Sequence, residues 1–495
     1  MFGLLETGLQ HFYWGNAIML IIGGVLIYLA IARKMEPLLL IPIGFGIMLV
    51  NLPLGGLMDY EMMLMSPATG TVLTIETEEG ARFSKDTVLV QLDSGEIRTP
   101  VFGRVGTYMV AAGDRVEEGD TIAKLITQEQ TNQEEYPTTP IGLLSRIFKY
   151  GVMWQILPPL MFLCLGALTD FGPMLSNPKT LLLGAAAQFG VYFAFFLALL
   201  AGFSVSEAAS IGIIGGAEGP TTIYVTSVLA PHIIGATAVA CYSYMALVAG
   251  FSVSEAASIG IIGGAEGPTT IYVTSVLAPH IIGATAVACY SYMALVPVIL
   301  PPVIRLLTTK EERKIYMKPQ MRPVAKTEKI LFPIITAVVV ILFVPSSAPL
   351  MGCFMVGNLF RESGVVERLS NTAQTSFVDI LTIFLTLAIG ASMPAENFLQ
   401  SKTLLILVLG VVSFASAAGA GVLLAKLMNV FSKEKINPMI GAAGVSAVPM
   451  SARVVQVMGQ KENPRNFLLM HAMGPNVAGA IGAAIAGGVF LGILA

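Results

Sequence analysis

Charge is scarce in this sequence. Asp, Glu, Lys and Arg make up 12% of its 495 residues, whereas soluble globular chains carry about 25%. Apolar residues make up 55%, and the mean hydropathy is +0.76. This composition excludes a soluble globular protein. The net charge of −3 says nothing about partners, because the charges are confined to a few loops, and we expect no nucleic-acid partner.

Cysteine is scarce too, and the N-terminus lacks the features of a cleaved leader. The cysteines stand in apolar runs without the spacing of metal ligands, so we interpret them as small buried apolar side chains. They are Cys164, Cys241, Cys289 and Cys353. Without a basic segment or a small-residue cleavage pattern, the first apolar run is expected to be a retained helix.

Apolar runs recur along most of the chain. A helix needs about 20 apolar residues to cross a hydrocarbon core of about 30 Å. Runs that approach or exceed this length lie at 17–33, 37–54, 154–171, 180–203, 329–351, 376–393, 403–428 and 466–495. With further glycine-broken stretches, they predict about ten or eleven elements that cross or re-enter the membrane. We therefore predict a polytopic α-helical membrane protein, with N-terminal membrane segments at 1–60 and a membrane core at 141–495.

A polar island at residues 66–128 interrupts the apolar pattern. It reads as short alternating strands with glycine turns, and its halves match at a spacing of 33, as Gly80 does with Gly113. The second half, GDRVEEGDTIAKL, resembles a biotinyl/lipoyl carrier domain, which carries a modified lysine on a hairpin tip. Here the corresponding tip, residues 92–100, has no lysine. We predict a small β-sandwich that cannot carry biotin in the usual way, either a docking or spacer module or an inserted loop domain.

A tandem repeat follows. Residues 201–248 and 249–296 are identical. Inverted repeats of transporters are usually diverged, so an undiverged tandem indicates either a recent duplication or an error in sequence assembly. Each polar residue of the unit has a twin in the other copy.

Two acids of this repeat stand in a helix-breaking context. Glu218 and Glu266 each lie in IIGGAEGPTTI, where glycine and proline weaken the helix and free backbone carbonyls. In a membrane such backbone persists inside protein or beside a water-filled cavity. Carboxylate, carbonyl and threonine oxygens together suit a hard cation. The alternative is a proline-kinked helix with a protonated glutamate. The acids Glu207 and Glu255 follow SVS, which favours helix capping.

A second polar cluster lies near the C-terminus. If its first segment is one helix, the spacing places its polar and small residues on a broad common stripe, namely Asn437, Gly441, Ser446 and Arg453. Asn476 follows Gly-Pro, which predicts a second broken helix. Small residues here could also serve helix packing alone. A buried Arg453 would need an anionic partner.

Lys and Arg gather in the loop 305–329, which predicts a cytoplasmic loop. Basic residues after the first run, Arg33 and Lys34, also favour the inside. If 37–54 crosses the membrane, the polar island lies outside. If 37–54 is re-entrant, the island lies inside.

Several segments of the sequence resemble motifs of a known family. The chain resembles the β subunits of the Na⁺-translocating biotin-dependent decarboxylases, which act on oxaloacetate, methylmalonyl-CoA or glutaconyl-CoA. The resemblance rests on EPLLLIPIGFG, LTDFGPMLSNPKTLLLGAAAQFG, SIGIIGGAEGPT, YSYMALVPVILPP, GNLFRESGVVERLSNTAQ and NPMIGAAGVSAVPMSARVVQ. It implies a carboxyltransferase α subunit, a biotin carrier subunit, a small membrane γ or δ subunit and a multi-pass location in the cell membrane. A homo-oligomer stays open.

The resemblance also implies a reaction. The β subunit would decarboxylate carboxybiotin held by a partner, consume a proton and move Na⁺ outward, and the chain itself would carry no biotin. The implied Na⁺ ligands are Glu266 (or Glu218), Asn437 and Asn476, with glutamate replacing the aspartate of the family. The positions implied in activity are Gly441, Ser446, Arg453 and Tyr292 (or Tyr244).

Within this scheme Arg453 would orient the carboxylate, and Tyr292 with Ser446 would handle protons. Tyrosines of a membrane-interface belt are the alternative for Tyr292 and its neighbour Tyr290. The alternative function is a standalone Na⁺ or H⁺ antiporter without biotin chemistry. A non-functional duplicated product is a third reading, which resequencing across 201–296 would test.

Overall fold

The computed structural model describes most of the chain. The described residues are 12–33, 37–53, 55–128, 138–179, 183, 253–264, 267–318, 322–399, 401–432, 434–445, 447 and 449–494. They form two compact units. The first falls within Met1–Tyr28, Ile41–Trp154 and Thr386–Gln400, and the second within Leu29–Leu40, Gln155–Leu385 and Ser401–Ala495. Each unit is described by itself.

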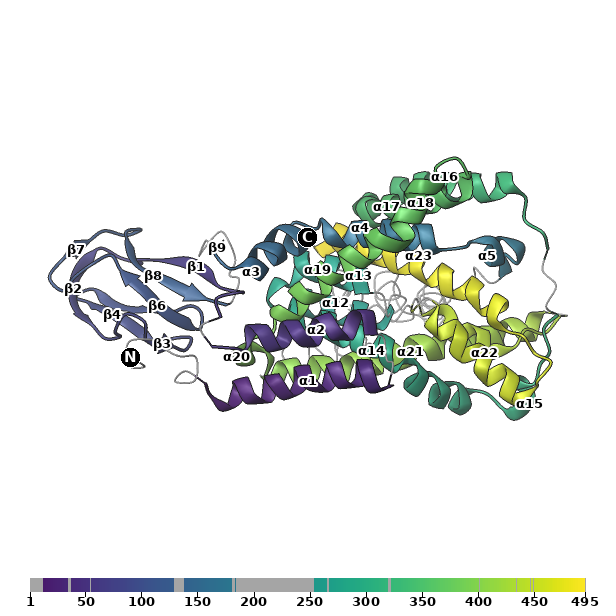
Figure 1. Cartoon of the computed structure of the whole chain (residues 1–495), viewed down its shortest axis with the longest axis horizontal. Coiled ribbons are helices and arrows are strands. Elements are labelled where there is room, and N and C mark those ends of the chain that lie inside the picture. The colour runs from purple at the N-terminus through teal and green to yellow at the C-terminus, as the bar shows by residue number, and fades with distance from the viewer. Residues whose placement is uncertain are drawn as a thin grey trace, which may run out of the picture. The chain divides into compact units, whose positions relative to one another are not determined.

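The first unit contains a region of two antiparallel sheets (Figure 1). One sheet has the order β3-β6-β8-β1-β9 and the other β5-β4-β2-β7. The strands are β1 (Tyr60–Met65), β2 (Gly70–Ile75), β3 (Arg82–Phe83), β4 (Val88–Leu92), β5 (Gly95–Arg98), β6 (Gly103–Tyr108), β7 (Arg115–Val116), β8 (Thr121–Thr127) and β9 (Thr138–Pro140). The polar island therefore forms strands, as its alternation predicts, and β1 begins before the predicted boundary at residue 66.

The two halves of this region make the same pair of turn contacts. Gly80 N donates to Val105 O at 2.8 Å, and Gly113 N donates to Val72 O at 2.8 Å. Both glycines have positive φ, 81° and 97°, which a residue with a Cβ rarely adopts. The match at a spacing of 33 is thus present in the hydrogen bonding as well as in the sequence.

Apolar helices complete the first unit. They are α1 (Trp14–Arg33) as far as Tyr28, α2 (Pro37–Val50) from Ile41, α3 (Leu143–Ile147), η3 (Phe148–Met153), α20 (Ala395–Phe398) and the end of α19 (Val378–Ala391). Gly23 of α1 and Gly44 of α2 face each other, and a Cβ on either would lie 2.6 Å from the carbonyl oxygen of the other. Small residues of this kind allow close helix packing in membranes.

The second unit is helical. Its elements are α4 (Leu157–Leu168), α5 (Gly172–Ser176), α12 (Val253–Gly260), η5 (Ile261–Gly264), α13 (Gly267–Leu277), η6 (Pro279–Ile281), α14 (Ile282–Leu307), α15 (Lys310–Arg313), α16 (Lys326–Phe343), η7 (Pro345–Ser347), α17 (Ala348–Ser363), α18 (Glu367–Thr372), η8 (Ala373–Phe377), α21 (Ser401–Phe431), η9 (Pro438–Gly444), α22 (Met450–Glu462) and α23 (Leu469–Leu494).

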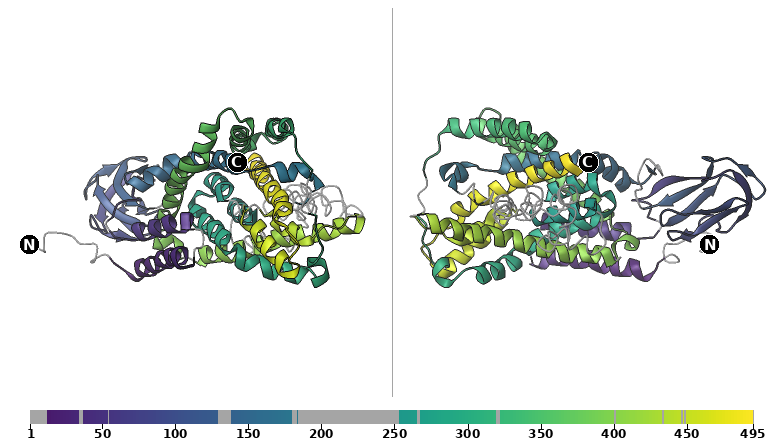
Figure 2. Two further views of the ribbon diagram at one scale, coloured as in Figure 1. Left: turned by 45° about the vertical axis from the view of Figure 1, so that its right-hand side comes forward. Right: turned by 180° about the vertical axis from the view of Figure 1, so that it is seen from behind.

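Glycines set the closest contacts of this unit. Gly166 of α4 packs on the backbone of α17 at Phe354, and Gly357 of α17 packs on the backbone of α4 at Leu163. The ribbons of the second unit show blue α4 running beside green α17 (Figure 2). A Cβ at either glycine would overlap a carbonyl oxygen. The helix pair therefore depends on these two positions.

Three helices of the described part are long and apolar enough to cross a membrane. They are Trp14–Arg33, Glu367–Ala391 and Leu469–Gly488, and two bent helix pairs raise the number to five at most. The predicted ten or eleven elements include re-entrant ones and the run at 180–203, most of which lies outside the described residues, so the number stays a prediction. Among the described runs, some form short helices, as α2 does with 14 residues, or bent pairs, as Pro279–Tyr290 and Leu295–Leu307 do at 69°.

The predicted burial of cysteine is confirmed for Cys164 and Cys289, whereas Cys353 is half-buried. Cys241 lies outside the described residues.

Candidate functional site

The interruption predicted in the second copy of the repeat falls on residues 265–266, which lie outside the described residues. Before them, α12 gives way to the 3₁₀ helix η5 at Ile261. The 3₁₀ helix η5 ends at Gly264 and α13 begins at Gly267. Glu266 lies between them, outside the described residues. Glu218, Tyr244 and Ser446 lie outside them too, so the structure does not place these predicted site residues.

Tyr290 of α14 packs against the start of α13. A Cβ at Gly267 would overlap the Tyr290 ring, so the ring lies one residue along the chain from Glu266. Tyr290 is buried, whereas the side chain of Tyr292 is not described. The resemblance implies a role for Tyr292 and gives none to Tyr290, and the contact of Tyr290 with Gly267 is what adds Tyr290 to the candidate residues.

Polar side chains continue along the buried interface of α13 and α14. Thr270 Oγ1 donates to Cys289 Sγ at 3.5 Å, and Thr285 Oγ1 lies 3.3 Å from Thr274 Oγ1. The threonines are fully buried. This interface therefore offers hydroxyl oxygens inside an otherwise apolar core.

Asn437 begins η9 and is fully buried. Its Oδ1 accepts a hydrogen bond from Met439 N at 3.1 Å, which caps the helix. Its Nδ2 donates to Arg313 O at 2.8 Å and Ile315 O at 3.0 Å. The amide is thus held by the loop 308–317, which follows α14 and contains the short helix α15.

An ion pair fixes that loop to α22. Arg313 is buried, and its Nε donates to Glu462 Oε1 at 2.9 Å. The Nη1 atom of Arg313 also donates to Thr308 O at 2.6 Å. Asn466 adds two contacts, from its Nδ2 to Ile315 O at 2.8 Å and from Met317 N to its Oδ1 at 3.2 Å. The loop therefore positions Asn437 from outside η9.

The two polar atoms of the Asn476 amide, in α23, differ in their hydrogen bonding. Its Nδ2 donates to Ala443 O at 3.1 Å, Val445 O at 2.7 Å and Ser451 Oγ at 2.9 Å. Its Oδ1 is buried and has no hydrogen-bond partner among the described residues. Buried polar atoms without a partner are rare and costly. A carbonyl oxygen left in this way is a ready ligand for a cation.

Asn358 of α17 shows the same arrangement. It was not predicted as a site residue, although it lies in GNLFRESGVVERLSNTAQ, one of the segments that carry the resemblance. Its Nδ2 donates to Gly166 O at 3.3 Å and Thr169 O at 2.8 Å at the end of α4. Its Oδ1 is buried and, within the described part of the chain, has no hydrogen-bond partner.

Two predictions for the C-terminal cluster are wrong. Residues 437–453 do not form one helix, because η9 ends at Gly444 and α22 begins at Met450 after Pro449. Pro475 does not break its helix, since α23 runs from Leu469 to Leu494 through it. The interruption of this half lies between η9 and α22 instead.

Arg453 and Gly441 have different surroundings from those expected. The prediction of a buried Arg453 is wrong: its side chain is exposed, because it stands in the first turn of α22 on the face away from the buried Ala452 and Val455. Gly441 packs against Gly421 of α21, backbone to backbone.

Asp170 links the end of α4 to α16. It accepts from Gly172 N at 2.8 Å and pairs with Lys329 Nζ at 3.2 Å. Burial raises the pKa of this carboxyl, but the Gly172 N–H and the Lys329 ammonium outweigh it and hold the pKa below its usual range. The carboxylate is therefore ionised at neutral pH.

The described residues contain no group of three or more His, Cys, Asp or Glu side chains that could hold a metal ion. In this part of the chain, oxygen ligands for a cation would come from amides, hydroxyls and the backbone. That donor set suits a monovalent hard cation better than a transition metal.

Comparisons with known proteins agree over the whole chain. The family model "Na+-transporting oxaloacetate decarboxylase beta subunit" matches residues 15–250 and 247–494. The chain belongs to this family. It is therefore a membrane protein and a β subunit of the Na⁺-transporting decarboxylase type. The boundary between the two matches falls at the junction of the repeat copies.

Curated relatives carry related names. A chain from Vibrio cholerae named as a probable oxaloacetate decarboxylase beta chain is 46% identical over 98% of this chain and 97% of its own length. The methylmalonyl-CoA decarboxylase subunit beta of Propionigenium modestum is 44% identical over 99% of this chain and 97% of its own. The oxaloacetate decarboxylase beta chain of Klebsiella pneumoniae is 44% identical over 98% and 96%.

Proposed function

We propose that the chain decarboxylates carboxybiotin held by a partner subunit and couples this step to Na⁺ export. In the reaction the N–C bond of carboxybiotin breaks, CO₂ leaves, and a proton replaces it on the biotin nitrogen. Membership of the family and the apolar helices support this proposal. The acyl substrate, oxaloacetate or methylmalonyl-CoA among the relatives, would be chosen by the carboxyltransferase.

The observation that carries the Na⁺ site is the Oδ1 atom of Asn476. It is buried without a hydrogen-bond partner in the described part of the chain, while the Nδ2 atom of the same amide makes three hydrogen bonds. An oxygen oriented so firmly and left unsatisfied fits a bound cation.

The proposal includes further Na⁺ ligands and groups that handle protons. Glu266 (or Glu218) would supply the charge at the interruption before α13. Asn437 would supply the second lone pair of its Oδ1, because the first accepts from Met439 N. Tyr292 (or Tyr244) and Ser446 would handle protons, and Tyr290 joins them because its ring lies against Gly267.

The exposure of Arg453 fits a carboxylate delivered by another polypeptide. A guanidinium recognises a carboxylate through a planar fork, and an exposed one is accessible to a biotin carrier. We therefore keep Arg453 as the residue that orients the carboxyl group of carboxybiotin.

The remaining parts of the proposal follow the family. The partners are a carboxyltransferase α subunit, a biotin carrier subunit and a small γ or δ subunit, in the bacterial cell membrane, with a homo-oligomer open. The two helix interruptions would belong to two inverted repeats. The β-sheet region would be a biotinyl/lipoyl-like module. It would serve docking and not carry biotin, because its tip between β4 and β5, Asp93–Ser94, has no lysine.

The experiment removes the acid from both repeat copies. In membranes that contain the partner subunits, Glu266→Gln combined with Glu218→Gln should abolish Na⁺ stimulation of decarboxylation and uptake of ²²Na⁺. The matched control is Glu255→Gln combined with Glu207→Gln, which removes the same charge from the same repeats. Glu255 stands in the first turn of α12 and lies 2.8 Å from His280, so the control should retain Na⁺ stimulation. Undiminished Na⁺-dependent turnover in the first variant would contradict the assignment.

Capture on avidin separates this function from a standalone antiporter. The chain should co-purify with a biotinylated partner from mildly solubilised membranes, and free biotin should abolish the capture. An antiporter would pass through avidin while still exchanging Na⁺ for H⁺ in vesicles.

A further inference from the structure

The helix hairpin of α22 and α23 is held at its tip by the loop 308–317. Glu462, the last residue of α22, accepts from Arg313 Nε at 2.9 Å. Asn466 of the connecting turn binds the same loop through both atoms of its amide. A Cβ at Gly459 would lie 2.7 Å from Leu468 Cδ1, so the two arms of the hairpin are in close contact. The side chains of α22 therefore project from a helix that is fixed in place.

Gln456 of α22 caps the start of α23. Leu469 is the first residue of α23, and the first N–H groups of a helix have no partner within it. Leu469 N donates to Gln456 Oε1 at 2.7 Å. An N–H donor requires the oxygen of the amide, so this contact settles which end of the amide is which. The Nε2 group lies at the other end, and among the described residues none accepts a hydrogen bond from it.

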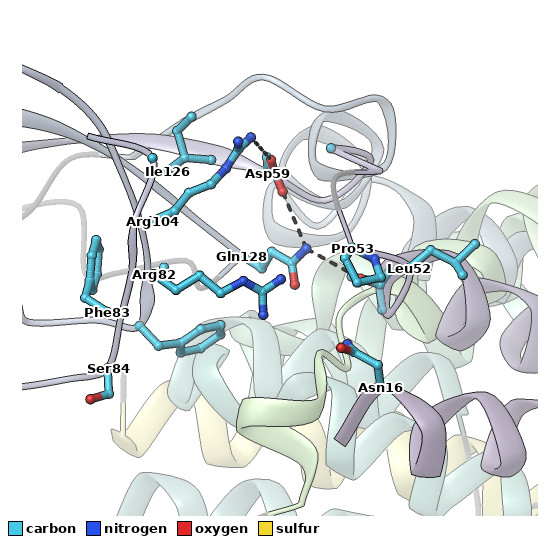
Figure 3. A pocket seen from close by; sticks show the side chains of 15 residues that line it. Asn16, Leu52, Pro53, Asp59, Arg82, Phe83, Ser84, Arg104, Ile126 and Gln128 are labelled. Atoms are coloured by element: carbon cyan, nitrogen blue, oxygen red, sulfur yellow. Dashed lines mark hydrogen bonds and ion pairs between the residues drawn. The ribbon is translucent and has the colours of Figure 1, made fainter. Parts of the chain in front are cut away.

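Two other glutamines use their amides in the opposite way. Gln128 lines a cavity of about 180 Å³ in the first unit, and Figure 3 shows its amide directed at two acceptors. Its Nε2 donates to Val50 O at 3.4 Å and to Asp59 Oδ1 at 3.5 Å. Gln374 Nε2 donates to Ser370 Oγ at 2.8 Å. In these two, neighbours within the chain use the amide donors, whereas the donors of Gln456 remain for another molecule.

Gln456 and Arg453 are neighbours on one face of α22. Residues three apart on a helix adjoin each other, and helical side chains lean toward the N-terminus of their helix, which for Gln456 is the turn of Arg453. Arg453 is exposed and Gln456 is half-buried. In the same turn as Arg453, Ser451 Oγ accepts from Asn476 Nδ2 at 2.9 Å. This turn of α22 therefore also reaches the candidate Na⁺ ligand.

Decarboxylation of carboxybiotin creates negative charge at a predictable atom. When the N–C bond breaks, its electron pair stays on the biotin nitrogen and is shared with the oxygen of the ureido ring, until a proton binds the nitrogen. A fixed hydrogen-bond donor at that oxygen stabilises the developing charge. The guanidinium of Arg453 would face the carboxyl group that leaves as CO₂, so the ureido oxygen needs a second donor close to Arg453.

We propose that Gln456 is this donor, and that its Nε2 binds the ureido oxygen of carboxybiotin while Arg453 holds the carboxyl group. The inference rests on the proposed function, because it assigns a further residue to the same reaction. The hydrogen bond from Leu469 N to Oε1 orients the amide for this task. The helix cap and the catalytic donor are thus the two ends of one side chain.

Gln456→Glu separates the two roles. A glutamate keeps an oxygen for Leu469 N, and its negative charge favours the N-terminus of α23, but it lacks the amide donor. With a carboxylated biotin carrier added to membranes that contain this chain, kcat of decarboxylation should fall by about 100-fold. The melting temperature in detergent should not fall, and Na⁺ should raise it as in the wild type.

Two further variants complete the test. Gln456→Met is neutral and should lose a similar share of kcat, so repulsion by the new charge is not the cause of the loss. Its melting temperature should fall, because the cap of Leu469 N is lost. Gln460→Glu is the matched control, since it introduces the same charge one turn further along the same helix, and it should keep the kcat of the wild type.

The outcomes that would overturn the inference are distinct from those that would overturn the proposed function. If Gln456→Glu decarboxylates the carrier as the wild type does, Gln456 is a helix cap alone. An equal loss in Gln460→Glu would trace the effect to charge on α22 and would also overturn the inference. If the wild type releases no CO₂ from the carboxylated carrier, the proposed function itself fails, and this inference fails with it.

Discussion

Gly441→Ala is expected to separate η9 from α21 and to abolish Na⁺-dependent activity. The Cβ of the alanine would overlap the carbonyl oxygen of Gly421, and the Cβ of a Gly421→Ala variant would overlap the carbonyl oxygen of Gly441. Neither backbone can relieve the overlap by rotating away, as a flexible side chain could. Overpacking of a core costs about 1–3 kcal/mol and occasionally more, and a contact between two backbones belongs at the upper end.

The displacement would also reach the candidate site. Gly441 lies within η9, which Asn437 caps and which Asn476 joins through Ala443 O. Thermal unfolding in detergent and Na⁺-stimulated decarboxylation would both be measured. Gly352→Ala of α17 is the control, because a Cβ there meets nothing within 4 Å and alanine favours the helix by roughly 1 kcal/mol. An undiminished melting temperature in Gly441→Ala would show that the close approach is not required.

The sequence predicted the membrane class correctly. The interruption predicted in IIGGAEGPTTI, where paired glycines precede the acid and Gly-Pro follows it, falls on residues 265–266, which lie outside the described residues, so it stays a prediction. Composition alone sufficed for the class, because few charges and long apolar runs leave no soluble alternative.

The second interruption was predicted at the wrong proline. Pro475 lies inside α23, where its missing N–H removes one backbone hydrogen bond, a loss that neighbours in a membrane bundle can absorb. Pro438 and Pro449 stand instead at the starts of η9 and α22, where no helical N–H is needed. Local propensity does not distinguish these cases, because tertiary contacts decide whether a proline continues or ends a helix.

The sequence pattern could not predict contacts between residues that are far apart in the chain. Arg313 pairs with Glu462, and Gly166 packs on Phe354. Each partner looks ordinary in its own segment, and nothing local indicates which distant residue it meets. The unpartnered Oδ1 atom of Asn476 could not be predicted for the same reason. It results from three acceptors on other parts of the chain, which bind Nδ2 and so orient the amide.

Asn476→Ala is expected to reduce the stabilisation by Na⁺. A ligand that binds only the folded state raises its stability in proportion to the logarithm of its concentration. In the wild type, Na⁺ should therefore raise the melting temperature above that in choline. Without the Oδ1 ligand, Na⁺ affinity should fall by about tenfold or more. The melting temperature in choline should also fall, because the carbonyls of Ala443 and Val445 lose their donor, at about 1–3 kcal/mol each.

Ser451→Ala separates the two effects. Ser451 Oγ accepts from Asn476 Nδ2 at 2.9 Å and, like the other described residues, makes no hydrogen bond with Oδ1. This variant should lower the melting temperature in choline and keep the increment from Na⁺. If Asn476→Ala retained the full increment, Asn476 would be a structural donor alone. The cation would then need other oxygens, and the buried Oδ1 would have to be satisfied by something other than Na⁺.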